Sequence, residues 1–158
     1  MRIAAAFDHR GVALREAVLE ALAGHEVIDL GTHDASVRVD YPDKAQQVAD
    51  ELLAGNAARG VLVCGSGVGA SVAACKVAGI RAAICHDVYS AHQGVEHDDM
   101  NVLCFGSEVV GPSLARELVA VFLEAQFDGG ERYVARLEKV AAMEREMKGL
   151  TDGKVTAP

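Results

Sequence analysis

A cysteine followed by three alternating glycines marks the stretch LVCGSGVGAS, residues 62–71. Cys64 ends an apolar run, and the loop after it leads into a small, apolar segment that suits a helix. The start of a helix is one of the environments that favour a thiolate over a thiol, and a thiolate can act as a base or a nucleophile. Cys64 is therefore a candidate catalytic group, although an ordinary core cysteine would also fit this position.

The glycines of this loop indicate an anion site. Successive backbone N–H groups of Gly65, Gly67 and Gly69 can point at one position, where the positive end of a helix would reinforce them. The spacing fits neither the dinucleotide fingerprint G-x-G-x-x-G nor the P-loop G-x-x-x-x-G-K-[ST]. The alternative is that these glycines only allow a helix to pack closely on a strand.

Two further pairs of residues could carry out acid–base chemistry. Asp8 and His9, in DHRG, follow the first apolar run, but Asp8 could equally cap the first helix. His97 and Asp98, in EHDDMN, precede the last apolar run, and their loop could swing them to the edge where Asp8 lies. A single histidine in a loop is more often solvated than catalytic.

Two arginines supply positive charge near the end of the chain. Arg132 and Arg136, in GGERYVARLEKV, lie one helical turn apart on one face, which suits a two-point grip on a phosphate. The alternative is a solvated helix face on which they pair with Glu131 and Glu138. Taken by themselves, the two arginines favour the solvated face.

Five short apolar runs alternate with segments of helical periodicity, and this alternation predicts the scaffold. The run GVLVC, residues 60–64, is continuous rather than alternating, as in a strand covered on both faces. We predict an α/β protein: a Rossmann-like, three-layer α/β/α sandwich with a five-stranded parallel sheet and helices on both faces. Strands are expected at residues 2–7, 26–31, 60–64, 80–85 and 101–106, and helices at 12–22, 45–53, 68–78, within 86–100, 112–127 and 131–148.

In sheets of this kind, ligands bind outside the carboxyl ends of the strands, where the strand order reverses. The predicted strand ends therefore indicate which polar residues should meet. They are Asp8 and His9, the loop 64–69, His86 and Asp87, and residues 106–108.

Length and composition limit the remaining possibilities. A chain of 158 residues, 51% hydrophobic, can build one core, so we expect a single domain over residues 1–148 and a polar, frayed tail at 149–158. The net charge of −8, the lack of a basic run and the few aromatic residues argue against a nucleic-acid surface. Neither a membrane span nor a signal peptide is predicted, which favours a cytoplasmic protein.

The cysteines do not form a metal or disulfide pattern. No two of the four have C-x-x-C spacing, and Cys64, Cys85 and Cys104 each end an apolar run. Reduced cysteines of a buried sheet show this arrangement, so neither zinc nor a disulfide framework is expected.

The motifs together resemble the type B ribose-5-phosphate isomerases, a family that includes the subunits of galactose-6-phosphate isomerase. The resemblance runs from residue 1 to about residue 147. It is carried, in the family's order and spacing, by FDHRG, EVIDLGT, VDYP, VCGSGVGASVAACKVAGIRAAICHD, YSA, EHDDMNVLCFGSEVVG and GGERY.

This resemblance implies an aldose–ketose isomerase of a phosphosugar that uses no metal or cofactor. It further implies a homodimer whose two active sites each take residues from both subunits, and it leaves open whether two such dimers form a tetramer. Interconversion of ribose 5-phosphate and ribulose 5-phosphate moves a proton between C1 and C2 through an enediolate. By the resemblance, Cys64 is the base at carbon and Ser66 shuttles the oxygen-bound proton. The other implied roles are ring opening and sugar binding for Asp8 and His97, enediolate binding for Gly65, Gly67, Val68 and Gly69, sugar contacts for Tyr41 and Asp98, and phosphate contacts for His9, Arg132 and Arg136.

Four positions depart from the family's pattern. Asp98 replaces an asparagine that contacts sugar hydroxyls, Tyr133 replaces a histidine, and Cys75 replaces another asparagine. Glu108 stands where relatives usually carry an arginine that binds phosphate. A carboxylate close to a bound phosphate dianion would lower the affinity of the protein for the phosphate. The loss would be large if the carboxylate is desolvated and small if it is exposed to solvent.

These departures leave three interpretations open. The first is a phosphopentose isomerase that uses Cys64. The second keeps the chemistry but changes the substrate to another phosphosugar or to a free aldose such as allose, as Glu108 suggests. The third is a non-catalytic protein that binds phosphosugars.

Overall fold

A five-stranded parallel sheet forms the centre of the protein. In the computed structural model, which describes the backbone of residues 1–152 and side chains up to Glu146, the strand order is β2-β1-β3-β5-β4. The strands are β1 (Arg2–Phe7), β2 (Glu26–Asp29), β3 (Arg59–Cys64), β4 (Ala82–Ile84) and β5 (Val102–Gly106). The predicted α/β class and parallel sheet are confirmed.

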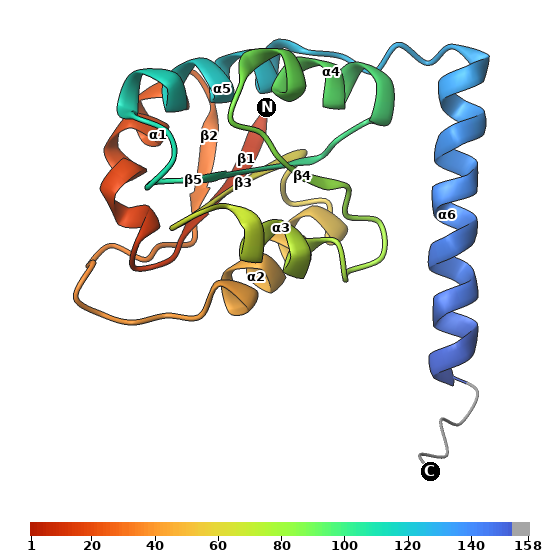
Figure 1. Ribbon diagram of the computed structural model, residues 1–158, viewed down its shortest axis with the longest axis horizontal. Helices are drawn as coiled ribbons and strands as arrows, with labels where there is room; N and C mark the ends of the chain where they lie inside the picture. The colour runs from red at the N-terminus through yellow and green to blue at the C-terminus, as the bar shows by residue number, and fades with distance from the viewer. Residues whose placement is uncertain (153–158) are drawn as a thin grey trace.

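Helices cover both faces of the sheet and complete three layers (Figure 1). One face packs on a cluster from α1, α4 and α5, and the other on a cluster from α2 and α3. The helical elements are η1 (Gly11–Leu14, a 3₁₀ turn), α1 (Arg15–Ala21), α2 (Tyr41–Leu53), α3 (Val68–Ala74), α4 (Val88–Asp98), α5 (Pro112–Glu124) and α6 (Glu131–Asp152).

Several boundaries differ from those predicted. The first helix begins as the 3₁₀ turn η1, and α2 begins at Tyr41 instead of residue 45, with Pro42 in its first turn, where a missing N–H costs nothing. α3 ends at Ala74, four residues earlier than predicted. α6 continues to Asp152, so the predicted tail at 149–158 starts inside a helix, and residues 153–158 lie outside the described residues.

α6 stands beside the sandwich and is not one of its layers (Figure 1). It spans 22 residues, or about 33 Å at the helical rise, and its packing partner in the body is α4. One hydrogen bond also joins it to the α3–β4 loop, where the Gly79 amide donates to Glu144 (3.1 Å). In the part of the chain that the structure describes, no helix is both long and apolar enough to cross a membrane.

Candidate active site

Cys64 ends the central strand β3 and faces the loop that follows it. The thiol is buried, and its Sγ accepts a hydrogen bond from the Gly67 amide at 3.1 Å. The next amide, of Val68, donates to the Ser66 hydroxyl at 3.3 Å, while the Ser66 side chain is exposed. The loop therefore curls around the cysteine, and two of its amides donate to side chains of the loop itself.

The loop has no room for a side chain at Gly67. Its φ is +81°, a left-handed conformation, and a Cβ there would lie 2.8 Å from the backbone carbon of Phe105. Gly106 at the end of β5 is equally confined, since its Cβ would meet the Ser66 backbone at 2.5 Å. The loop after Cys64 thus rests directly on the neighbouring strand.

Gly67→Ala is expected to destabilise the fold by about 2–4 kcal/mol, because alanine combines left-handed strain with a clash against fixed backbone. Thermal unfolding checks this, with Tm about 10 °C lower. Gly24→Ala is the matched control, since a Cβ at Gly24 has nothing within 4 Å, and its cost is expected to be below about 1 kcal/mol. Equal Tm values for the two variants would contradict the account of the loop.

Asp8 and His9 lie at the carboxyl end of β1, next to β3. Asp8 is buried, and its Oδ1 accepts from the amides of Arg10 (2.9 Å) and Gly11 (2.7 Å). Its carboxylate therefore holds the two amides that lead into η1, close to the capping role that the sequence offered as the alternative. The His9 Nδ1 lies 3.2 Å from the Val39 carbonyl, so as a donor there it leaves Nε2 free to face a substrate.

Tyr41 joins the same edge from α2. Its ring lies against Gly69, where a Cβ would come within 2.7 Å of the ring carbon Cζ. Tyr41 remains 42% exposed, so the ring borders the start of α3 without being buried. Asp8, His9, Tyr41 and the loop at Cys64 are thus brought together within one chain, as the sequence predicted.

Arg10 and Glu108 form an ion pair at this edge that the sequence analysis did not find. The Arg10 guanidinium lies over Gly65, and Glu108 reaches it from the loop after β5. His86, at the end of β4, accepts a hydrogen bond from the Gly106 amide (3.2 Å). The sequence signal for the ion pair was only that two strand ends of a parallel sheet carry opposite charges.

His97 and Asp98 lie at the opposite edge of the sheet, so the prediction that their loop would bring them to Asp8 is wrong within one chain. α4 leaves the carboxyl end of β4 and returns to the amino end of β5, and its 11 residues span about 16 Å. Both residues lie at the last turn of that helix. The crossover of a parallel sheet makes this unavoidable, because a residue just before a strand lies at the amino edge.

Tyr133 gathers His97 and the two arginines into one cluster. Its buried ring stacks on His97 with ring centroids 4.4 Å apart, and Arg132 donates to its hydroxyl at 2.8 Å. The guanidinium of Arg136 lies 5.9 Å from the same ring. Gln93 approaches the His97 Nδ1 at 2.7 Å. His97, Arg132 and Arg136, all predicted site residues, therefore meet near the start of α6. They surround Tyr133, which stands where the family pattern has a histidine.

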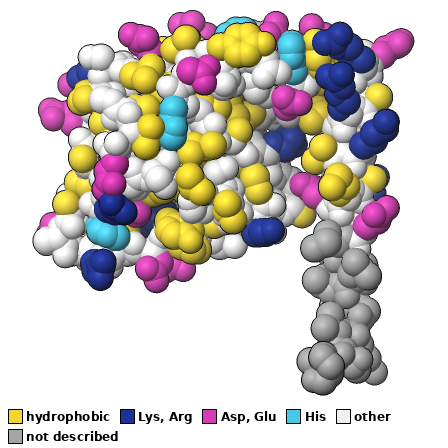
Figure 2. All heavy atoms as spheres, in the orientation of Figure 1, with side chains coloured by type: hydrophobic (Ala, Val, Ile, Leu, Met, Phe, Trp, Pro, Cys, Tyr) yellow, Lys and Arg dark blue, Asp and Glu magenta, His cyan; other side chains and the backbone are white. Residues whose placement is uncertain are grey.

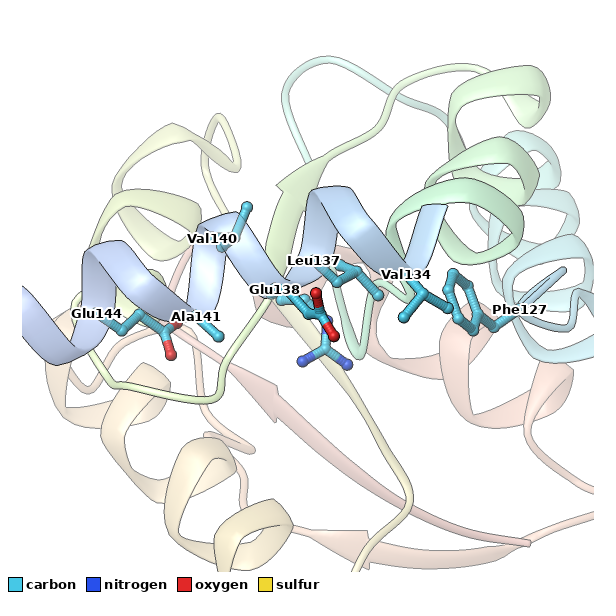
Figure 3. A pocket seen from close by; sticks show the side chains of 8 residues that line it. Phe127, Val134, Leu137, Glu138, Val140, Ala141 and Glu144 are labelled. Carbon is cyan, nitrogen blue, oxygen red and sulfur yellow. The ribbon is translucent and has the colours of Figure 1, made fainter. Parts of the chain in front are cut away.

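A groove runs between α6 and the body beside this cluster. Its volume is about 840 Å³, and Asp98, Arg136 and the exposed Cys75 are among its lining residues. Figure 2 shows the recess between the column of α6 and the body, with hydrophobic side chains on both. A smaller pocket of about 290 Å³ adjoins it, where Val134 of α6 lies next to Phe127 (Figure 3).

Two of the other cysteines, Cys85 and Cys104, are buried in the sandwich. Burial raises the pKa of Cys85 to about 11, and it raises the pKa of the fully buried Cys104 well above its ordinary value. Both remain neutral thiols at physiological pH. Within the described residues, no group of three or more His, Cys, Asp or Glu side chains could hold a metal ion.

Comparison with known proteins shows which family the chain belongs to. The family model described as Ribose/Galactose Isomerase matches residues 3–140. The chain belongs to the ribose/galactose isomerase family. It is 47% identical to ribose-5-phosphate isomerase B of Escherichia coli over 146 residues, which cover 91% of this chain and 97% of that protein.

Other members of the ribose/galactose isomerase family extend the comparison. A solved ribose-5-phosphate isomerase B of Clostridium thermocellum superposes with a TM-score of 0.89 at 42% identity, covering 93% of this chain and 99% of that chain. A D-erythrulose-4-phosphate isomerase of Pectobacterium atrosepticum is 35% identical over 94% of this chain and 98% of that protein. The protein is accordingly a sugar-phosphate isomerase, and the predicted resemblance is confirmed.

Proposed function

We propose that this isomerase interconverts D-ribose 5-phosphate and D-ribulose 5-phosphate, with Cys64 as the base at carbon. The observation that carries the proposal is the position of Cys64: a buried sulfur at the end of the central strand that accepts the Gly67 amide. The 47% identity to a ribose-5-phosphate isomerase B over 91% of this chain supports the choice of substrate.

The isomerisation moves one proton from C2 to C1 of the substrate and needs no other reactant. The Cys64 thiolate removes the proton from C2 of the open-chain aldose, and the electron pair of that bond forms a C1–C2 double bond. The π pair of the C1 carbonyl moves onto O1 at the same time, which gives the enediolate. The thiol then returns the proton to C1, which yields the ketose. The exposed Ser66 hydroxyl moves the oxygen-bound proton between O1 and O2, and backbone amides of the loop 65–69 stabilise the oxyanion.

Ring opening and phosphate binding need residues that one chain does not bring to Cys64. Asp8 has one carboxylate oxygen available beside the cysteine loop, and His9 offers Nε2 to a phosphate. His97, Asp98, Arg132 and Arg136 lie at the far edge of the sheet. We propose that a second copy of this chain presents its own His97 cluster to the Cys64 edge, so that each site is shared by two subunits.

The arrangement of α6 supports this second copy. The helix stands apart from the sandwich, and an apolar groove of about 840 Å³ lies along it. Unpaired apolar surface of this kind is typical of faces that another subunit covers. The same association would order the two arginines against the partner's substrate.

The experiment that tests the function compares substrates of the purified protein. Isomerisation of ribose 5-phosphate, erythrulose 4-phosphate, free ribose and allose is measured under one set of conditions. We expect the highest kcat/KM with ribose 5-phosphate. Faster turnover of erythrulose 4-phosphate, the substrate named for one relative, or of a free aldose would replace the proposed substrate. Binding of ribose 5-phosphate without turnover of any of the four would support a non-catalytic protein.

A further inference from the structure

Arg10 places a positive charge beside the loop 65–69 that follows Cys64, and the mechanism proposed above gives this charge no role. Its side chain crosses Gly65, where a Cβ would come within 2.8 Å of the Arg10 Nε and 2.9 Å of its Cζ. The guanidinium therefore lies one residue from Cys64 along the loop, at the edge that also carries His9. About half of the side chain, 54%, is exposed, so a ligand in the site could reach it.

Three neighbouring strands hold this arginine and its partner in place. Ser107, after β5, donates through its hydroxyl to the Arg10 carbonyl (2.9 Å) and through its amide to the Cys64 carbonyl (2.9 Å). The amide of Glu108 donates to the Gly65 carbonyl at 3.0 Å, which places its carboxylate beside the guanidinium. The ends of β1, β3 and β5 are thus joined around one ion pair.

Two other basic side chains near the strand ends have partners of their own. Lys44 donates to the Leu30 carbonyl (2.6 Å), and Arg15 pairs with Asp29, which lies on the outer strand β2. The partner of Arg10 is instead Glu108, an exposed carboxylate that a dianion of higher charge can displace from the guanidinium. Arg10 is therefore well placed to meet a substrate phosphate, because its guanidinium lies over Gly65 and is half-exposed.

We propose that Arg10 binds the phosphate group of the substrate and so sets the preference for phosphorylated over neutral sugars, while Glu108 competes with the phosphate for the guanidinium. This inference rests on the proposed isomerase function and adds a contact within the chain that carries Cys64. It also assigns a role to the charge reversal at position 108, since the positive charge comes from Arg10 across the same loop.

The test uses single neutralising substitutions with a matched control pair. Arg10→Gln and Glu108→Gln are compared with Arg116→Gln and Glu20→Gln, which neutralise an ion pair of similar exposure (43% and 51%) between α5 and α1. Each control changes the net charge by the same amount as its test variant. Measurements are kcat and KM for ribose 5-phosphate, and the inhibition constant of inorganic phosphate.

We expect Arg10→Gln to raise KM for ribose 5-phosphate and the inhibition constant of phosphate about 5- to 10-fold, with kcat changed less than about twofold, because the pair is half-exposed and partly screened. Glu108→Gln is expected to lower both constants about threefold, since glutamine can still hold the guanidinium but no longer competes as an anion. Raising the salt concentration should narrow both differences.

Constants for Arg10→Gln that match those of Arg116→Gln would overturn the phosphate contact. An increase in KM with Glu108→Gln would overturn the competition. If the wild type does not isomerise ribose 5-phosphate, the proposed function fails by itself. Binding of inorganic phosphate to wild type and Arg10→Gln, followed by the shift in Tm, then still decides the inference: an equal shift in both proteins refutes it.

Discussion

Replacing Cys64 by alanine is expected to lower kcat for ribose 5-phosphate by about 10³-fold, with KM changed by less than about threefold. In the proposed mechanism the Cys64 thiolate acts in the transition state, where it takes the C2 proton, and substrate binding relies on other groups. The Gly67 amide that donates to Sγ loses its acceptor, but the loop is still held against Phe105 and Gly106. Steady-state kinetics on the purified variant measure both constants.

Cys75→Ala is the matched control for this experiment. Cys75 is an exposed thiol that donates to the Ala82 carbonyl at 3.1 Å, well away from the strand ends that carry the site. Cys75 lines the α6 groove, so the control is assayed at a protein concentration well above the dissociation constant of the dimer. Under that condition its removal is expected to leave kcat within about twofold, because it lies at none of the strand ends around Cys64. If Cys64→Ala retains more than about a tenth of wild-type kcat, the base at carbon must be another group.

Mixing two inactive variants is expected to restore activity. Cys64→Ala and His97→Ala each spoil every site of their own homodimer, if one site combines Cys64 of one copy with His97 of the other. In a mixed dimer, one site carries both substitutions and the other carries neither. Random exchange of equal amounts makes half of the dimers mixed, each with one intact site of two, so about a quarter of wild-type activity should return.

The control for this mixing experiment is a pair of variants that damage the same half of the site. Cys64→Ala mixed with Asp8→Ala should stay inactive, because both residues lie at one edge of the same chain. Activity is followed after the subunits have exchanged, with the dimer population checked by native mass spectrometry. If the Cys64→Ala and His97→Ala mixture remains inactive after exchange, the sites are not shared in the way proposed.

Much of the scaffold followed from local patterns in the sequence. β3 and β5 are continuous apolar runs, which only a sheet covered on both faces accommodates, and they occur within one residue of the predicted positions. The predicted positions of the helix ends were less accurate, because helix ends depend on tertiary contacts. α2 gains its first turn where the Tyr41 ring packs on Gly69, a contact with another helix that periodicity cannot report.

The candidate site was predictable where it follows strand ends and not where it depends on distant side chains. Asp8 and Cys64 terminate adjacent strands, so their meeting follows from the parallel order alone. The predicted position of His97 is wrong because this residue lies at the end of a crossover helix. Such a helix ends at the amino ends of the parallel strands, whereas Cys64 lies at their carboxyl ends. The Arg10–Glu108 pair joins residues far apart in the chain, and no local pattern indicates which opposite charges will meet.

α4 separates His97 from Cys64 within one chain, and this separation bears on how specific activity depends on protein concentration. If each site is divided between two chains, as we propose, it exists only in the associated state, and the number of working sites follows mass action. Specific activity per chain is then constant at high protein concentration and declines on dilution below the dissociation constant of the dimer. Mutations in the α6 groove, remote from the substrate, would change turnover through that same equilibrium.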